Sequence, residues 1–328
     1  MAAETAILVQ DLYKDFGDIH AVQGASFAAE PGEILSLLGP NGAGKSTTIS
    51  ILACLAQPTR GDAWIMGHSI RNEPMAVKES IGVVPQEIAL YEDLSARENL
   101  NFWGKMYGLR GAALNERVDE VLDIVGLVDR QKGRVSKYSG GMKRRLNIGI
   151  ALLHRPQVVI MDEPTVGIDP QTRRNILDSV KAFNRQGMTV LYTTHYMEEA
   201  QELSDHIAIM DQGQVIAYGS HDELVKIVGE LDRIDLTASS STGGPAPFEA
   251  LLPRWQTIDG VHQVHQASET EDETGDGLIT LLVDDSNSVL PRLFEAATQA
   301  GARITSVDIQ EPNLEAVFLH LTGRALRE

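Results

Sequence analysis

The sequence has 328 residues, of which 43% are hydrophobic, enough for one large or two ordinary buried cores. Its net charge of −18, from 28 basic and 46 acidic residues, repels phosphate backbones, so we expect no nucleic-acid partner. The single cysteine, Cys54, excludes a disulfide framework and fits a reducing compartment.

Apolar runs in the sequence are far shorter than the roughly 18 to 20 residues that span a bilayer, and residues 278–283 form one of the longest. The N-terminus lacks the basic region and the long apolar run of a secretory signal. We therefore expect a soluble chain that reaches a membrane only through a membrane-spanning partner.

Residues 5–228 alternate short apolar runs with helical periodicity, which predicts an α/β fold around a largely parallel sheet. A turn with glycine at 211–213 predicts a hairpin between the last two strands of this region. The predicted strands cover residues 34–38, 81–84, 158–161, 189–192, 207–210 and 214–218.

A glycine-rich segment of the form G-x-x-x-x-G-K-[ST] follows the first strand and opens a predicted helix with Ile49, Leu52 and Ala56 on its apolar face. Glycines let main-chain N–H groups converge on phosphates, and a helix N-terminus adds the positive end of its dipole. Lys45 is expected to reach the β- and γ-phosphates, and the Ser46 hydroxyl to bind Mg²⁺. The predicted phosphate loop consists of Gly39, Pro40, Asn41, Gly42, Ala43, Gly44, Lys45, Ser46 and Thr47.

Two carboxylates, Asp162 and Glu163, follow the apolar strand at 158–161. Alone, an acidic pair there is weak evidence, because many strands simply end in solvated residues. With a phosphate loop in the same α/β region, Asp162 is expected to hold Mg²⁺ and Glu163 to polarise the attacking water. The sequence therefore predicts an enzyme that hydrolyses a nucleoside triphosphate with Mg²⁺ as cofactor.

The segment 138–142, Tyr-Ser-Gly-Gly-Met, places a serine N-cap and two glycines at the start of a predicted helix, which forms a second anion-ready helix N-terminus. It resembles the Leu-Ser-Gly-Gly-Gln signature of the ATP-binding cassette (ABC) ATPases, and its variant looks like the drug-exporter branch typified by daunorubicin-resistance ATPases. The resemblance covers residues 5–228. It implies a P-loop NTPase cassette with a parallel-sheet core, an antiparallel β subdomain and a helical subdomain at about 87–155.

The resemblance also implies roles for single residues. Phe16 matches the aromatic that stacks on adenine, and Gln86 matches the glutamine that senses Mg²⁺ and couples to the membrane subunit. Asp169 matches the loop that communicates across a dimer, and His195 the switch histidine at the γ-phosphate. Beyond the phosphate loop, ATP is expected to contact Phe16, Gln86, Ser139, Gly140, Gly141 and Asp169; the catalytic set is Lys45, Glu163 and His195, and the metal set is Ser46, Gln86 and Asp162.

Three features leave alternatives open. Lys143, Arg144 and Arg145 have the wrong charge for a first helical turn, so they either face phosphate or acidic groups or merely solubilise the helix. The helix opened by the capping box at Ser95 has apolar residues on several faces, which either meet a membrane subunit or form internal core. Phe16 is either the adenine-stacking ring or an ordinary core residue.

Residues 229–328 differ from the preceding region in composition and carry most of the net charge. From residue 230 onward, 17 acidic and 6 basic residues give −11. A predicted linker at 239–245 and an acidic loop at 269–276 interrupt elements in the order βαββαβ, the ferredoxin-like split arrangement. We expect a small regulatory or dimer-contacting α+β domain, whose end at 311–323 resembles that of the same exporter branch. Its predicted strands cover 233–237, 261–266, 278–283 and 303–309, and its predicted helices 248–254, 288–300 and 313–321.

The sequence therefore favours the ATP-hydrolysing subunit of an exporter, bound at the cytoplasmic face of the cell membrane to a permease on another chain. Two copies are expected to sandwich two ATP molecules, each between the phosphate loop of one copy and Ser139 of the other. The alternatives are an importer ATPase and a soluble ABC-type ATPase of translation or repair. The segment 138–142 and the tail argue against the importer, and the single cassette and acidic charge against the soluble ATPase.

Overall fold

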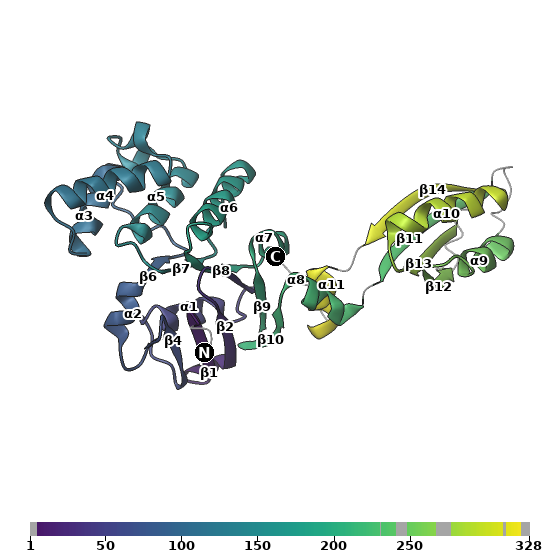
Figure 1. Ribbon diagram of the computed structural model, residues 1–328, viewed down its shortest axis with the longest axis horizontal. Coiled ribbons are helices and arrows are strands. Elements are labelled where there is room, and N and C mark those ends of the chain that lie inside the picture. Colours follow the sequence, from purple (N-terminus) through teal and green to yellow (C-terminus); the bar gives the residue numbers. More distant parts are fainter. Residues whose placement is uncertain (1–4, 230, 241–247, 267–276, 311–312, 323–328) are drawn as a thin grey trace. The chain divides into compact units, whose positions relative to one another are not determined.

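The structure is a computed structural model in which the chain divides into two units, each with its own apolar core (Figure 1). The first unit contains the described residues up to Leu224 together with Leu321 and Thr322, and the second contains Val225–His320. The described residues are 5–229, 231–240, 248–266, 277–310 and 313–322.

A six-stranded sheet of order β10-β9-β3-β8-β7-β6 forms the centre of the first unit, and only β10 is antiparallel to its neighbour. Neighbouring residues of these strands, such as Val158 and Val159, enter different apolar clusters, so both faces of the sheet are packed. All six predicted strands are confirmed, with ends that differ by at most two residues. The strands are β3 (Ile34–Leu38), β6 (Ile81–Val84), β7 (Val158–Asp162), β8 (Thr189–Thr194), β9 (His206–Asp211) and β10 (Gln214–Gly219).

A second sheet of the first unit is antiparallel, with the order β2-β1-β4-β5, and confirms the expected antiparallel β subdomain. Its apolar side chains share a core with α1 (Lys45–Leu52), the helix that follows the phosphate loop. That helix is shorter than predicted: it ends at Leu52, and the chain turns at Cys54 with a φ of 54° before Ala56. The remaining elements are β1 (Ile7–Phe16), β2 (Ile19–Ala29), β4 (Arg60–Ile65), β5 (His68–Ser69) and α2 (Pro74–Ser80).

A group of helices, α3 to α5, gathers in another region of the first unit around its own apolar cluster (Figure 1). The predicted capping box is present, because Ser95 Oγ accepts a hydrogen bond from Glu98 N and Ser95 N donates to Glu98 Oε2. Phe102 and Met106 remain exposed, so the reading of this helix as wholly internal core is wrong. The helices are α3 (Ala96–Met106), α4 (Gly111–Ile124), η1 (Val128–Arg130), η2 (Val135–Lys137) and α5 (Gly140–Leu152).

Three further helices follow: α6 (Pro170–Asn184), α7 (Met197–Leu203) and α8 (His221–Val225). The last residue of α8 and the following η3 (Lys226–Val228) belong to the second unit. Leu177 and Val180 of α6 and Leu203 of α7 pack in the second apolar cluster of the central sheet. Nowhere in the described ranges is a helix both long and apolar enough to cross a bilayer.

The second unit confirms the predicted βαββαβ order, and its antiparallel sheet β12-β13-β11-β14 has the ferredoxin-like strand arrangement. Trp255 of α9 is buried, and its Nε1 donates to the Leu293 carbonyl of α10, 3.1 Å away. The elements are β11 (Asp232–Ser240), α9 (Phe248–Gln256), β12 (Val261–Gln266), β13 (Gly277–Val283), α10 (Ser286–Gln299), β14 (Ala302–Gln310) and α11 (Leu314–Thr322).

One prediction for this unit is corrected. Ser239 and Ser240 were expected in the linker, but they end β11 and pair with Arg303 and Ala302 of β14. Backbone pairing to a neighbouring strand overrides the turn preference of serine there. The rest of the predicted linker, the acidic loop at 269–276 and residues 311, 312 and 323 of the terminal segment lie outside the described residues.

Candidate active site

The phosphate loop connects β3 to α1 in a conformation that requires glycine. Gly44 has a φ of 102°, and a Cβ there would lie 2.6 Å from the Ala21 carbonyl oxygen. Among the described residues no side chain caps α1 at Gly44, so the N–H groups of its first turn suit an anion. The buried Lys45 Nζ donates to the carbonyls of Gly39 and Pro40, at 2.6 and 3.0 Å.

A cavity of about 560 Å³ opens beside this loop, a volume typical of small-molecule sites. Residues 41–47 line it together with Phe16, Gln86 and Glu163, which come from distant parts of the sequence. The Phe16 side chain is 52% exposed, so the reading of it as a core residue is wrong. Its ring lines this cavity, and Lys14 Nζ lies over the ring, 4.7 Å from the centroid.

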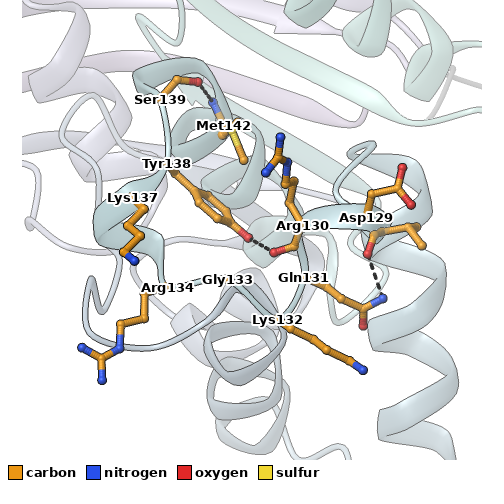
Figure 2. A pocket seen from close by; sticks show the side chains of 11 residues that line it. Asp129, Arg130, Gln131, Lys132, Gly133, Arg134, Lys137, Tyr138, Ser139 and Met142 are labelled. Atoms are coloured by element: carbon orange, nitrogen blue, oxygen red, sulfur yellow. Dashed lines mark hydrogen bonds between the residues drawn. The ribbon is translucent and has the colours of Figure 1, made fainter.

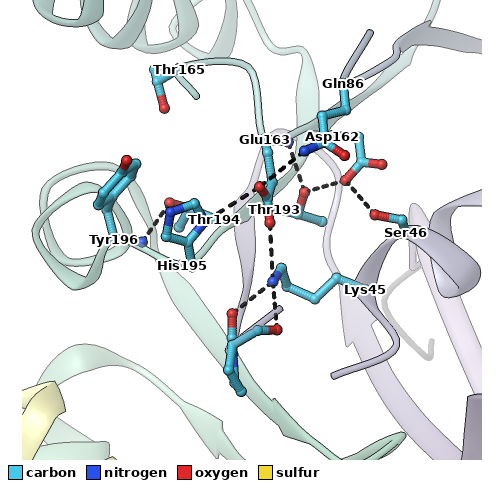
Figure 3. Close-up of polar contacts among 12 residues, drawn as sticks. Lys45, Ser46, Gln86, Asp162, Glu163, Thr165, Thr193, Thr194, His195 and Tyr196 are labelled. Carbon is cyan, nitrogen blue, oxygen red and sulfur yellow. Dashed lines mark hydrogen bonds and ion pairs between the residues drawn. The ribbon is translucent and has the colours of Figure 1, made fainter. Parts of the chain in front are cut away.

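The end of β7 brings Asp162 next to the phosphate loop (Figure 3). Its Oδ1 accepts hydrogen bonds from Ser46 Oγ at 3.3 Å and from Thr193 Oγ1 at 2.7 Å. Thr193 also accepts a bond from the main-chain N–H of Glu163, 2.9 Å away. Sequence reasoning missed Thr193, because a threonine inside an apolar strand carries no signal of its polar partners.

Glu163 is the point at which four segments of the chain meet (Figure 3). Its Oε1 lies 3.1 Å from Lys45 Nζ, and its Oε2 accepts a hydrogen bond from Gln86 Nε2 at 3.5 Å. Oε2 also lies 3.3 Å from His195 Nδ1, which is close enough for an ion pair but is not aligned as a hydrogen bond. Glu163 itself has a φ of 43°, a left-handed conformation uncommon for a non-glycine residue. Four predicted residues are thus brought together.

The signature segment, residues 138–142, lies at the start of α5 and away from this cluster. Ser139 Oγ caps the helix by accepting from Met142 N at 3.3 Å, as predicted. A Cβ on Gly141 would lie 2.3 Å from Thr172 Cγ2, so close packing against α6 requires glycine there. Neither Ser139 nor its two glycines are among the residues that line the phosphate-loop cavity.

Ser139 instead lines a second cavity, of about 690 Å³ (Figure 2). Its lining includes Arg130, Lys132, Arg134 and Lys137 against one acidic residue, Asp129, so the opening next to the signature segment is basic. Tyr138 lies within it, and its hydroxyl donates to the Arg130 carbonyl at 2.6 Å. This basic surface stands out in a chain of net charge −18.

Asp169 is the N-cap of α6, where its Oδ1 accepts a hydrogen bond from Thr172 N at 3.0 Å. That hydrogen bond lowers the pKa of the Asp169 carboxyl, which is exposed. Like Ser139, Asp169 is absent from the described lining of the phosphate-loop cavity. Its capping role is therefore evident within one chain, and its expected role across a dimer stays a prediction.

The reading in which the three cations after the signature segment face acidic groups is confirmed for Lys143 alone, and neither reading holds for Arg144 and Arg145. Lys143 Nζ pairs with Glu92 at 2.5 Å, and Arg145 Nη1 donates to the Val125 carbonyl at 3.1 Å. Arg144 is buried and donates to the carbonyl of Gln86 at 2.6 Å. The charges are thus directed to partners within the chain, which no sequence pattern announces.

This fold, with a phosphate loop, an acidic strand end and a Ser-Gly-Gly helix start, defines an ATP-binding cassette. A family model described as ABC transporter matches residues 22–166. The linearmycin resistance ATP-binding protein LnrL of Bacillus subtilis (strain 168) is 46% identical over 97% of this chain and 99% of that protein. The daunorubicin resistance ATP-binding protein DrrA3 of Streptomyces coeruleorubidus is 39% identical over 98% of this chain and 97% of that protein.

The Nod factor export ATP-binding protein I of Rhizobium etli is 34% identical over 99% of this chain and 95% of that protein. Among solved structures, the dimeric post-hydrolysis state of the ATP-binding cassette MJ0796, bound to ADP and Pi, resembles it with a TM-score of 0.59 and 28% identity. That match covers 65% of this chain and 98% of the other. The chain belongs to the ATP-binding proteins of ABC transporters, and it resembles drug-resistance members of that family.

Proposed function

We propose that this chain hydrolyses Mg²⁺-ATP and couples the reaction to export through a permease on a separate chain. The observation that carries the proposal is the position of Glu163, within 3.5 Å of Lys45, Gln86 and His195 beside the phosphate-loop cavity. The names of the relatives, which refer to drug resistance and to export, favour an exporter over an importer or a soluble ATPase.

The residues around the cavity fit a nucleoside triphosphate. Main-chain N–H groups of residues 42–47 and the N-terminus of α1 would hold the phosphates, and Lys45 would neutralise the β- and γ-phosphates. The exposed ring of Phe16 would stack on the adenine. The glycines of the loop leave the space that the phosphates need.

The donor set beside Lys45 fits Mg²⁺, which prefers oxygen ligands. Ser46 Oγ and Asp162 Oδ1 already lie 3.3 Å apart, and Gln86 lines the same cavity. We assign the metal to these three residues. When bound, Mg²⁺ neutralises charge on the phosphate oxygens.

Hydrolysis then requires a base, and Glu163 is the carboxylate placed for it. It would accept a proton from water as the water oxygen bonds to the γ-phosphorus and the bond to the β-phosphate oxygen breaks, giving ADP and phosphate. His195, beside the same carboxylate, would contact the γ-phosphate. Lys45 must first move its charge from Glu163 to the phosphates.

Ser139, Gly140, Gly141 and Asp169 do not line the phosphate-loop cavity of their own chain, so we assign them to the ATP of a second copy. A twofold dimer would complete two identical sites. The similarity to a cassette whose structure is dimeric supports this assignment. The basic cavity next to Ser139 would also reduce repulsion between two acidic chains.

The exposed side of α3 is our candidate for permease docking at the cytoplasmic face of the membrane. Phe102, Met106 and Tyr107 are 38%, 68% and 41% exposed, and the rings of Tyr91 and Phe102 meet edge to face at 4.9 Å. Exposed aromatic and methionine side chains are common where two proteins bind.

We also propose that the cassette extends over residues 5–228, with a helical subdomain at about 87–155, and that 229–328 form a regulatory or dimer-contacting domain. A separate apolar core under α9 and α10 supports an independent second domain. Its net charge of −11 forms either a solvated acidic face or part of an interaction surface.

The test is to reconstitute the chain with its permease in vesicles, with ATP supplied on the side of this subunit. Mg²⁺-dependent hydrolysis should carry substrate away from that side, and Glu163→Gln should abolish both. Met106→Asp should lose stimulation by the permease but keep the hydrolysis of the isolated chain. Met75→Asp is the control, since Met75 is 67% exposed on α2. Movement toward the ATP side would mean import, and hydrolysis indifferent to any permease would mean a soluble ATPase.

A further inference from the structure

Arg144 lies in the first part of α5, five residues after Ser139, with only 3% of its surface exposed. Its guanidinium donates two hydrogen bonds to consecutive main-chain carbonyls, Nη1 to Pro85 at 2.7 Å and Nη2 to Gln86 at 2.6 Å. Both acceptors belong to the segment that follows β6 and carries Gln86. The side chain therefore ties the signature helix to that segment.

A buried guanidinium is costly unless its donors are satisfied. Burial lowers the pKa of Arg144, and the nearby Tyr192 and Asp162 oppose that shift. Within the described residues its Nε has no hydrogen-bond partner. An apolar side chain of similar size would fill this space without that cost, so packing alone does not explain an arginine here.

Gln86 connects this contact to the proposed chemistry. Its side-chain Nε2 lies 3.5 Å from Glu163 Oε2, at the limit of a hydrogen bond, so a small displacement of the main chain would separate the two groups. Arg144 is hydrogen-bonded to the main-chain carbonyl of the same residue, Gln86. A change in the orientation of α5 would thus reach Glu163 through Gln86.

We propose that Arg144 is a positioning residue that holds Gln86 in register with Glu163 and links it to the signature segment. The proposal rests on the proposed function, in which Ser139 serves the ATP of the partner copy and Gln86 the ATP of its own. Arg144 then connects the two ATP sites of a dimer within each protomer.

Arginine suits this task better than lysine, because its planar fork reaches two neighbouring carbonyls at once. Arg145 provides a matched comparison on the same helix. It also donates to two consecutive carbonyls, those of Val125 and Gly126, but these lie at the end of α4 and not beside Gln86.

The experiment compares Arg144→Met, Arg144→Lys and Arg145→Met in the full-length protein, each shown by circular dichroism to be folded. Hydrogen exchange of a peptide covering residues 85–91 should rise at least about tenfold in Arg144→Met, less in Arg144→Lys and not in Arg145→Met. At saturating ATP, kcat should fall at least about tenfold in Arg144→Met, while the Kd for ATP stays within about threefold. In a Gln86→Ala background, Arg144→Met should lower kcat no further.

Equal hydrogen exchange of residues 85–91 in Arg144→Met and Arg145→Met would show that Arg144 does not hold this segment, whatever the ATPase activity. Faster exchange with unchanged kcat would overturn the positioning role. If Arg144→Met does not fold, the same criteria apply to Arg144→Lys, which keeps the charge. Failure of the wild type to hydrolyse ATP would refute the proposed function. The hydrogen-exchange data would still decide whether Arg144 holds the segment that carries Gln86.

Discussion

Lys45 Nζ and Glu163 Oε1 lie 3.1 Å apart as a buried ion pair between the phosphate loop and the end of β7. Two opposite charges in a buried site stabilise each other, and removing one leaves the other uncompensated. In the proposed mechanism, the phosphates of ATP would become the partner of Lys45 and would release the Glu163 carboxylate to act as a base. The pair therefore favours an order of events in which nucleotide binding precedes activation of water.

Glu163→Gln should lower turnover at least about 100-fold, because the amide cannot accept the proton of the attacking water. ATP binding should be retained or strengthened, since the Glu163 carboxylate no longer competes with the ATP phosphates for Lys45. Phosphate release and equilibrium binding measure the two effects, and size exclusion should show an accumulated ATP-bound dimer. Glu198→Gln, an exposed carboxylate of α7, is the control. Near-normal turnover of Glu163→Gln would remove this residue from the mechanism.

Phe16→Ala should weaken ATP binding by about 1–3 kcal/mol, the usual contribution of a base stacked on an aromatic ring. Phe16→Tyr should restore the affinity, because stacking needs only the ring. Other purine triphosphates should lose affinity by the same factor, which competition binding measures. An unchanged Kd for Phe16→Ala would show that this exposed ring does not contact the base.

The residues that sequence could place best lie in short strands that are fully or almost fully buried. β3 and β6 were predicted to the residue, because their apolar runs are bounded by polar residues, glycine or proline. β1 and β2 were implied only by the resemblance. They contain repeated register shifts, and Asp11 adopts a φ of 45°, so alternation of polar and apolar residues is lost.

In the candidate site, too, some residues could be predicted from the sequence and others could not. Motifs and resemblance predicted that Lys45 and Glu163 both belong to the catalytic set, and the structure places them 3.1 Å apart, because the loop and the strand end meet at one edge of the parallel sheet. Arg144 could not be predicted, since its partners are main-chain carbonyls that become available only through tertiary packing. The extent of β11 was also missed, because Ser239 and Ser240 read as a linker until a partner strand is known.

A chain that ends at Gly229 should fold and bind Mg²⁺-ATP with a Kd within about tenfold of the full protein, or about 1.4 kcal/mol. Every residue expected at the nucleotide, from Phe16 to His195, lies in the first unit, and the second unit has its own core. Dimerisation or stimulation by the permease should change instead. A shortened chain with native circular dichroism but no ATP binding would contradict the proposed boundary.

His154 should make stability depend on pH. Its Nε2 donates to the Ile81 carbonyl at 2.8 Å, and its ring stacks on Tyr107. Burial lowers the pKa of this imidazole, while the hydrogen bond to Ile81 opposes the shift. The unfolded chain therefore binds more protons below about pH 6.5, so the free energy of unfolding falls with acidification.

In His154→Gln that loss is absent, so the stability advantage of the wild type should shrink as the pH drops from about 8 to 5. Urea unfolding of both proteins across this pH range measures the difference between their free energies of unfolding. Taking the difference cancels the effects of the other titrating groups. A difference that is independent of pH would show that the imidazole keeps its ordinary pKa in the folded protein.

The most direct test of the account mixes Lys45→Ala and Ser139→Arg protomers. A heterodimer then holds one intact site, made of Lys45 from one copy and Ser139 from the other. Each variant alone should be nearly inactive. Random 1:1 mixing makes half of the dimers heterodimers with half of their sites intact, so hydrolysis should recover to at most about one quarter of wild type. Full activity of Ser139→Arg alone, or no recovery in verified heterodimers, would contradict a site shared between two chains.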